Sequence, residues 1–156
     1  MARLIIWLSV SVVLLSGCSL SKEAEIEIRV EALRYAFKAE TANWEWEGKK
    51  WTEISQSIFV VECDAHGTEV IKNLGDYPVA GELVNVGDRG GGFVEPISGK
   101  SVAFWEVKEV VRSKDGAYLV DVGCTMGGLH GYGQILRLEK IAGRWVVISS
   151  TPTWVS

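Results

Sequence analysis

The sequence predicts an α+β domain in which an N-terminal amphipathic helix packs on a curved antiparallel sheet. Three observations lead to this prediction. Residues 22–40 repeat apolar side chains at helical spacing, the last third of the chain alternates apolar and polar residues, and Asp115-Gly116 separates two such segments. Because neither a helix nor a sheet can bury its apolar side alone, we expect the helix to cover one sheet face.

The helix is expected over Lys22–Glu40. Ser21 precedes it and is expected to act as its N-cap, because a serine hydroxyl can accept a hydrogen bond from an amide of the first turn. Charged residues, Arg29 among them, are expected to form its solvent-exposed face. Four apolar residues at spacings of four, three and four line the other face: Ile26, Val30, Leu33 and Phe37.

Residues 41–101 carry weaker signals. Short strands are expected at Ile58–Cys63 and Leu83–Val86, and a short helix at Thr68–Leu74 with Thr68 as its cap. Gly87–Gly92 contains four glycines and is expected to be a flexible loop. Trp44 and Trp46 have the spacing of one strand face, and they either pack at the core or form a platform for a membrane interface or a ligand.

The last third of the chain predicts an antiparallel meander. Strands are expected at Val102–Val111, from Tyr118 to Met126, at Gln134–Lys140 and at Trp145–Ile148. Ser113–Gly116 supplies the first hairpin turn, because Asp-Gly is the strongest short signal of such a turn. A glycine-rich turn or bulge is expected from four residues: Gly127, Gly128, Gly131 and Gly133.

The chain begins with a secretory signal. Arg3 precedes the apolar run Leu4–Leu15, whose twelve residues are fewer than the roughly 20 that span a bilayer as a helix. The residues Leu15-Ser16-Gly17-Cys18 resemble the lipobox of bacterial lipoprotein signal peptides. The resemblance implies that the Cys18 thiol receives a diacylglycerol group, that cleavage follows Gly17, and that the new amino group is acylated. The alternatives are an ordinary cleaved signal with an incidental cysteine, and an uncleaved anchor.

The predicted mature protein is a single domain, residues 18–156, after removal of the signal peptide 1–17. Cleavage leaves 139 residues and changes the net charge from −4 to −5. Anionic lipids repel an acidic domain, so the acyl chains on Cys18 are expected to hold it at the membrane. By resemblance to sorting rules in bacteria with two membranes, Ser19 after the cysteine favours the outer membrane. The expected location is the cell envelope, facing the periplasm or the exterior.

The order of elements resembles the nuclear-transport-factor-2-like, or cystatin-like, cone. Residues 115–156, DGAYLVDVGCTMGGLHGYGQILRLEKIAGRWVVISSTPTWVS, carry most of this likeness. Their closing segment is also similar to small bacterial proteins with no assigned activity. The resemblance implies a cone that can form a pocket, in which enzymatic relatives use an aspartate base and a tyrosine donor. Candidates here are Asp121, Tyr118 and Tyr132, although Asp121 alternates with the apolar residues and is expected to point outward.

Cys63 and Cys124 remain once Cys18 is acylated. In an oxidising compartment they form either a disulfide or two buried thiols. A zinc site that also uses His66 and His130 is a further alternative. The separation of Cys124 from His130 is loose for such a site, so no metal site is predicted. Residues 98–101 mimic the end of a phosphate-binding loop, yet Val94 stands where that loop needs glycine. No cofactor is therefore expected.

These observations favour a non-catalytic binding or interaction module in the bacterial envelope, whose partner is an envelope protein or a small ligand in the cone. The alternative function is a small pocket enzyme, an isomerase or hydratase acting on an apolar molecule. The sequence does not distinguish a purely structural role at the cell surface from the non-catalytic binding module. With 16 basic and 20 acidic residues and no arginine–aromatic stripe, nucleic-acid binding is not expected.

Overall fold

A computed structural model shows that the fold is α+β, as expected. The structure describes residues 20–43, 45–46, 49–50, 58–75, 79–80, 87–89, 92–94, 102–127 and 130–155. The helices in these ranges are α1 (Lys22–Asn43) and α3 (Gly67–Asn73). The strands are β1 (Glu45–Trp46), β2 (Lys49–Lys50), β3 (Ile58–Cys63), β4 (Val79–Ala80), β5 (Gly87–Arg89), β6 (Gly92–Val94), β7 (Val102–Arg112), β8 (Tyr118–Gly127), β9 (His130–Ile141) and β10 (Arg144–Val155).

The main sheet has six strands in the order β10-β9-β8-β7-β3-β4. Strands β7 to β10 form the predicted antiparallel meander, and Gly116 has a φ of 94° in the first turn. The prediction of an entirely antiparallel sheet was wrong, because β3 pairs in parallel with both β7 and β4. A long segment that includes α3 separates β3 from β7, and such a crossover permits parallel pairing where a short hairpin does not.

In the middle of the chain, the structure confirms some of the predicted elements and corrects others. Strand β3 is confirmed, and α3 is confirmed with His66 rather than Thr68 at its N-cap, at a φ of 58°. The loop expected at Gly87–Gly92 was wrong in part, because β5 and β6 pair as a small antiparallel ribbon. Leu83–Val86, residues 98–101, Trp44 and the leader with Cys18 lie outside the described residues.

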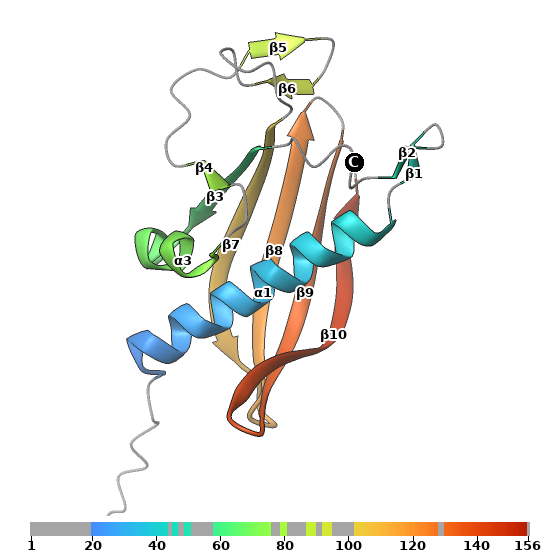
Figure 1. Cartoon of the computed structure of the whole chain (residues 1–156). Coiled ribbons are helices and arrows are strands. Elements are labelled where there is room, and N and C mark those ends of the chain that lie inside the picture. The colour runs from blue at the N-terminus through green and yellow to red at the C-terminus, as the bar shows by residue number, and fades with distance from the viewer. Residues whose placement is uncertain are drawn as a thin grey trace, which may run out of the picture.

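The N-terminal helix lies across one face of β7–β10 (Figure 1). Its start is capped as predicted, since the amide of Ala24 donates to the Ser21 hydroxyl at 3.2 Å. The Phe37 ring meets the Trp105 ring edge-to-face at 4.9 Å between centroids. The core between helix and sheet is made of fully buried apolar side chains, among them Ile28, Leu33, Phe37, Trp105, Val107, Val120, Leu136 and Leu138.

One charged residue of α1 departs from the predicted solvent-exposed face. Arg29 is only 2% exposed and lies against strand β7. The helix turns 100° per residue, so a charged position next to an apolar stripe can face the sheet when the sheet offers it partners. None of the described helices has the length and apolar character needed to span a bilayer.

Candidate functional site

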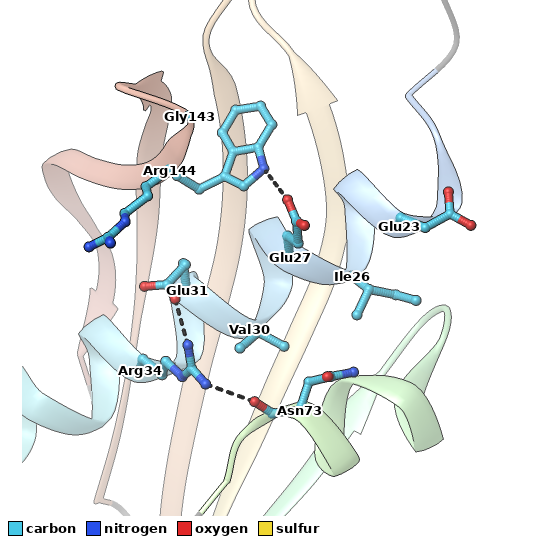
Figure 2. A pocket seen from close by; sticks show the side chains of 10 residues that line it. Glu23, Ile26, Glu27, Val30, Glu31, Arg34, Asn73, Gly143 and Arg144 are labelled. Carbon is cyan, nitrogen blue, oxygen red and sulfur yellow. Dashed lines mark hydrogen bonds and ion pairs between the residues drawn. The ribbon is translucent and has the colours of Figure 1, made fainter.

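A groove of about 620 Å³ runs along α1, and we call it the α1 groove (Figure 2). Asn73 at the end of α3 borders it on one side, and the β9–β10 turn borders it on the other. Ile26 and Val30 supply its apolar part. Its remaining lining residues are polar, charged, glycine or aromatic: Glu23, Glu27, Glu31, Arg34, Gly143, Arg144 and Trp145.

The three glutamates of the groove follow one another at every fourth position of α1, so they lie along one side of the helix. The Glu27 carboxylate accepts a hydrogen bond from the Trp145 indole nitrogen at 3.2 Å. Glu31 accepts from Arg34 at 2.7 Å, and Arg34 also donates to the main-chain oxygen of Asn73 at 2.8 Å. Glu31 and Arg34 neutralise each other, whereas Glu23 forms no ion pair with any residue that the structure describes.

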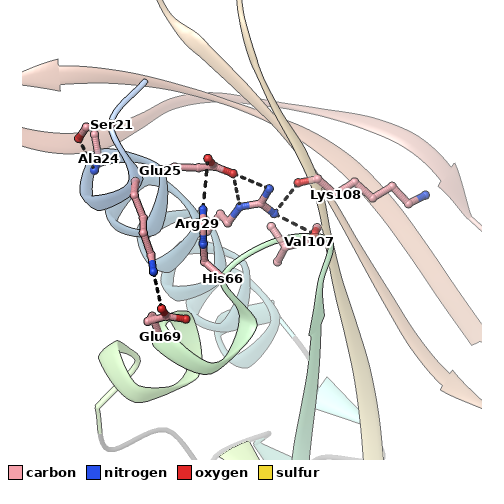
Figure 3. Close-up of polar contacts among 9 residues, drawn as sticks. Ser21, Ala24, Glu25, Arg29, His66, Glu69, Val107 and Lys108 are labelled. Carbon is pink, nitrogen blue, oxygen red and sulfur yellow. Dashed lines mark hydrogen bonds and ion pairs between the residues drawn. The ribbon is translucent and has the colours of Figure 1, made fainter. Parts of the chain in front are cut away.

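A second polar cluster lies beneath the first turns of α1 (Figure 3). The Arg29 guanidinium donates to the main-chain oxygens of Val107 at 3.1 Å and Lys108 at 2.8 Å. Its Nε and Nη2 atoms donate to Glu25 Oε1 at 3.2 and 2.9 Å. The other Glu25 oxygen lies 3.7 Å from His66 Nε2. The Arg29 charge is thus held by a carboxylate and two carbonyls.

The position of this cluster explains the burial of Arg29. The β7–β8 pairing changes register between Val107 and Val110, which is a β-bulge or similar irregularity. A bulge leaves main-chain groups without ladder partners, and buried carbonyls need donors. Arg29 supplies them from the helix. The cluster therefore holds α1 to the sheet, and we assign it a structural role.

The three residues proposed from the cone resemblance do not come together. Tyr118 and Tyr132 lie on the helix-covered side, where their rings meet Trp145 and Trp105 edge-to-face at 5.3 and 6.1 Å. Asp121 lies on the opposite side, with Lys108 Nζ 3.9 Å from its carboxylate. The strand period of two residues puts odd and even positions of β8 on opposite faces. The outward direction predicted for Asp121 is therefore confirmed, and these residues do not share one cavity.

The two described cysteines also lie apart. Cys63 pairs in register with Val107, while Cys124 pairs with Trp105 on the other edge of β7. Two strand spacings amount to about 9.5 Å, more than the roughly 6.8 Å that a disulfide allows between Cα atoms. No disulfide joins them. Burial is the main cause that raises the pKa of the Cys63 thiol to about 11.

The described ranges contain no group of three or more His, Cys, Asp and Glu residues placed to hold a metal ion. Of the residues considered for zinc, His66 has its Nε2 atom 3.7 Å from a Glu25 oxygen, and the His130 side chain lies outside what the structure describes.

Two smaller hollows lie on the sheet face opposite α1. One, of about 470 Å³, is lined by Lys108, Leu119, Asp121 and Ile135 among others. The other, of about 370 Å³, includes Trp154. A Cβ atom added to Gly133 would lie 2.1 Å from the Trp154 indole nitrogen, and one added to Gly131 would lie 2.9 Å from its ring. Gly131 and Gly133 therefore lie within β9 and make room for Trp154. The predicted glycine-rich turn or bulge is confirmed as a bulge, because the strand pairing changes register beside Gly127 in β8 and opposite Gly133 in β10.

The α1 groove was not predicted from the sequence. A spacing of four between Glu23, Glu27 and Glu31 was the available signal, but charged residues at that spacing ordinarily cover a solvated helix face. Trp145 gave no local sign that its indole would reach α1. The chain matches no family model, no curated protein and no solved structure.

Proposed function

We propose that the chain is a lipid-anchored protein of the bacterial envelope, and that its domain is a non-catalytic module binding a positively charged segment of an envelope protein. The Leu15–Cys18 pattern supports the anchor. The α1 groove carries the binding proposal, because it places two carboxylates and an aromatic ring beside an apolar strip. The cone-like curvature of the sheet and the outer-membrane location remain parts of the same proposal.

The chemistry of the groove favours a lysine or arginine side chain as the bound group. Glu23 has no ion-pair partner among the described residues, and Glu27 is oriented by the Trp145 indole. A cation between two carboxylates forms charge-assisted hydrogen bonds. The apolar stem of lysine or arginine can lie along Ile26 and Val30. The groove volume of about 620 Å³ lies within the roughly 300–1,000 Å³ of small-molecule sites.

The alternative, a pocket enzyme acting on an apolar molecule, has less support. It needs a cavity with a buried carboxylate base between helix and sheet. That space is filled by Leu33, Phe37 and Trp105, each no more than 1% exposed. Within the described ranges the buried charged residue is Arg29, a cation that already holds its partners. Turnover of a small substrate by the pure protein, with no partner recovered from cells, would favour the enzyme instead.

The anchor is tested by Cys18→Ser in the native host. We expect the variant to escape acylation and cleavage after Gly17, because the thiol receives the lipid. Mass spectrometry of the wild-type protein is expected to show an N-terminal Cys18 carrying acyl chains. An intact leader, or a trimmed terminus without fatty acid, would exclude the anchor.

The groove is tested by photocrosslinking in intact cells. A photoreactive residue at Asn73, which borders the groove, is expected to capture one specific envelope protein, whereas the same residue at the exposed Val155 is not. Glu23→Gln with Glu27→Gln is expected to lower the yield at position 73 at least about tenfold, because each charged hydrogen bond contributes about 1.5–3 kcal/mol.

The matched control replaces two exposed carboxylates elsewhere, Glu62→Gln with Glu109→Gln, and is expected to leave the yield unchanged. Equal yields from both double variants would show that the groove carboxylates do not bind the partner.

A further inference from the structure

We infer that the turn end of the sheet is a second membrane-binding surface, which rests on anionic lipid headgroups and sets the orientation of the anchored domain. We define this hairpin end as residues 112–117 and 137–144. Figure 1 shows the β7–β8 and β9–β10 turns together at one end of the sheet. The inference rests on the proposed anchor at Cys18, and it adds a partner, the lipid surface, to a region that shares Gly143 and Arg144 with the α1 groove.

The charge of the hairpin end is opposite to that of the domain. It carries five cations and two carboxylates, a net charge of +3, within a mature chain of net charge −5. Both carboxylates form ion pairs with the same residue, Arg137. Arg137 Nη2 lies 2.7 Å from Asp115 Oδ2 and 3.0 Å from Glu139 Oε1. The remaining cations pair with none of the described carboxylates: Arg112, Lys114, Lys140 and Arg144.

The β9–β10 turn adds an apolar tip between two of these cations. Ile141 is 51% exposed at the end of β9, and Lys140 and Arg144 flank it on the two strands. Lys140 Nζ lies 5.3 Å from the centroid of the Trp145 ring. An apolar tip flanked by cations and an indole suits the boundary between headgroups and acyl chains.

The anchor leaves the domain next to this end. Leu20 packs against the core, so only Ser19 separates the acylated Cys18 from a fixed residue, a reach of about 7 Å. The β9–β10 turn lies beside the N-terminal half of α1, because Trp145 just after this turn donates to Glu27 at 3.2 Å and Gly143 lines the same groove as Glu23. A domain held on so short a tether must touch the bilayer with the surface around α1's start. Attraction between the four cations and anionic lipid selects the hairpin end.

The test uses the acylated protein purified from native membranes. It is reconstituted into vesicles of phosphatidylcholine alone, and into vesicles that also contain phosphatidylglycerol. A water-soluble reagent acetylates exposed lysines, and mass spectrometry gives the rate at each site. On anionic vesicles we expect Lys114 and Lys140 to react about fivefold more slowly than on neutral ones, and high salt is expected to abolish the difference. Lys72, exposed on α3, is the internal control.

A double charge-reversal variant tests whether the cations of the β9–β10 turn hold the hairpin end on the lipid. Lys140→Glu with Arg144→Glu is expected to remove the protection of Lys114, whereas Lys72→Glu is expected to keep it. All three side chains are exposed, so thermal unfolding should change little. Equal acetylation of Lys114 and Lys140 on both vesicle types would overturn the inference.

The outcome also separates this inference from the proposed anchor. Unprotected lysines on protein that sediments with neutral vesicles would refute the hairpin end and leave the anchor intact. Sedimentation with anionic vesicles alone, with Lys114 protected, would refute the anchor and keep the hairpin end. Failure to sediment with either would refute both.

Discussion

The buried guanidinium of Arg29 donates a hydrogen bond to the main-chain oxygen of Val107 at 3.1 Å, where the β7–β8 pairing changes register. The same oxygen accepts from the Asp64 amide at 3.3 Å, so one carbonyl connects α1, the end of β3 and β7. A helix arginine therefore completes the hydrogen bonding of an irregular strand. This contact links the N-terminal helix to the sheet more specifically than apolar packing does.

Replacing Arg29 by methionine is expected to lower the free energy of unfolding by about 1–3 kcal/mol, because Glu25 and the Lys108 carbonyl lose their donor and the Val107 carbonyl keeps only the Asp64 amide. Urea denaturation measures the change. Arg34→Met is the matched control, since its side chain is 41% exposed and its pair with Glu31 should contribute about 1 kcal/mol or less. Equal losses from the two variants would show that the Arg29 contacts are not special.

Leu33→Ala is expected to cost about 2–5 kcal/mol, because Leu33 is fully buried between α1 and the sheet. Tyr35→Ala, at a position 38% exposed on the same helix, is expected to cost far less. Thermal unfolding of both variants compares them. A small effect at Leu33 would mean that α1 does not pack on the sheet in solution.

Gly133→Ala is expected to displace the Trp154 ring, because the new methyl group would lie 2.1 Å from the indole nitrogen. Overpacking of this kind costs about 1–3 kcal/mol. The difference in fluorescence between each protein and its Trp154→Phe counterpart reports the ring's environment. Gly123→Ala is the control, since its nearest Trp154 atom would be 3.6 Å away. Unchanged Trp154 emission in Gly133→Ala would contradict the contact.

The Asp115 carboxyl is expected to show a pH-dependent contribution to stability. The hydrogen bond from Arg137 is the main cause that lowers its pKa from 3.8 to about 2. A carboxyl with a lowered pKa stabilises the fold above its unfolded-state pKa, and the contribution disappears as the pH falls toward 2. The stability difference between wild type and Asp115→Asn should thus be constant above about pH 5 and shrink between pH 4 and 2. A difference that does not change across this window would refute the assignment.

The Cys63 thiol is expected to react slowly at neutral pH. Its pKa is raised to about 11, first by burial, while the nearby Asp64 and Glu62 charges oppose ionisation further. Since the thiolate is the nucleophile, the rate of alkylation by iodoacetamide should rise about tenfold per pH unit from pH 8 to 10. Mass spectrometry of the Cys63 peptide measures it. A rate that levels off below pH 9 would indicate an ordinary exposed thiol.

Local chemistry was enough to predict much of the fold. The Ser21 cap, the β7–β8 turn and strand β3 depend on residues close together in sequence, and all three are confirmed. Parallel pairing of β3 with β7 was not predictable in this way, because it depends on a crossover between distant segments. The burial of Arg29 was not predictable either, since a Glu25–Arg29 pair at this spacing ordinarily lies on a solvated helix face and the two main-chain partners are 78 and 79 residues away.

The candidate site shows the same division. The sequence alone predicted an α+β domain with a capped helix and an antiparallel meander, because periodicity, capping and turn chemistry are local properties. It also contains the lipobox-like pattern that predicts the anchor. Only the tertiary structure brought Glu27 to Trp145 across 118 residues and placed the cations of two turns at one end. Such neighbours depend on how the helix lies across the sheet and where the bulge occurs, and those are decided by the packing of the whole core.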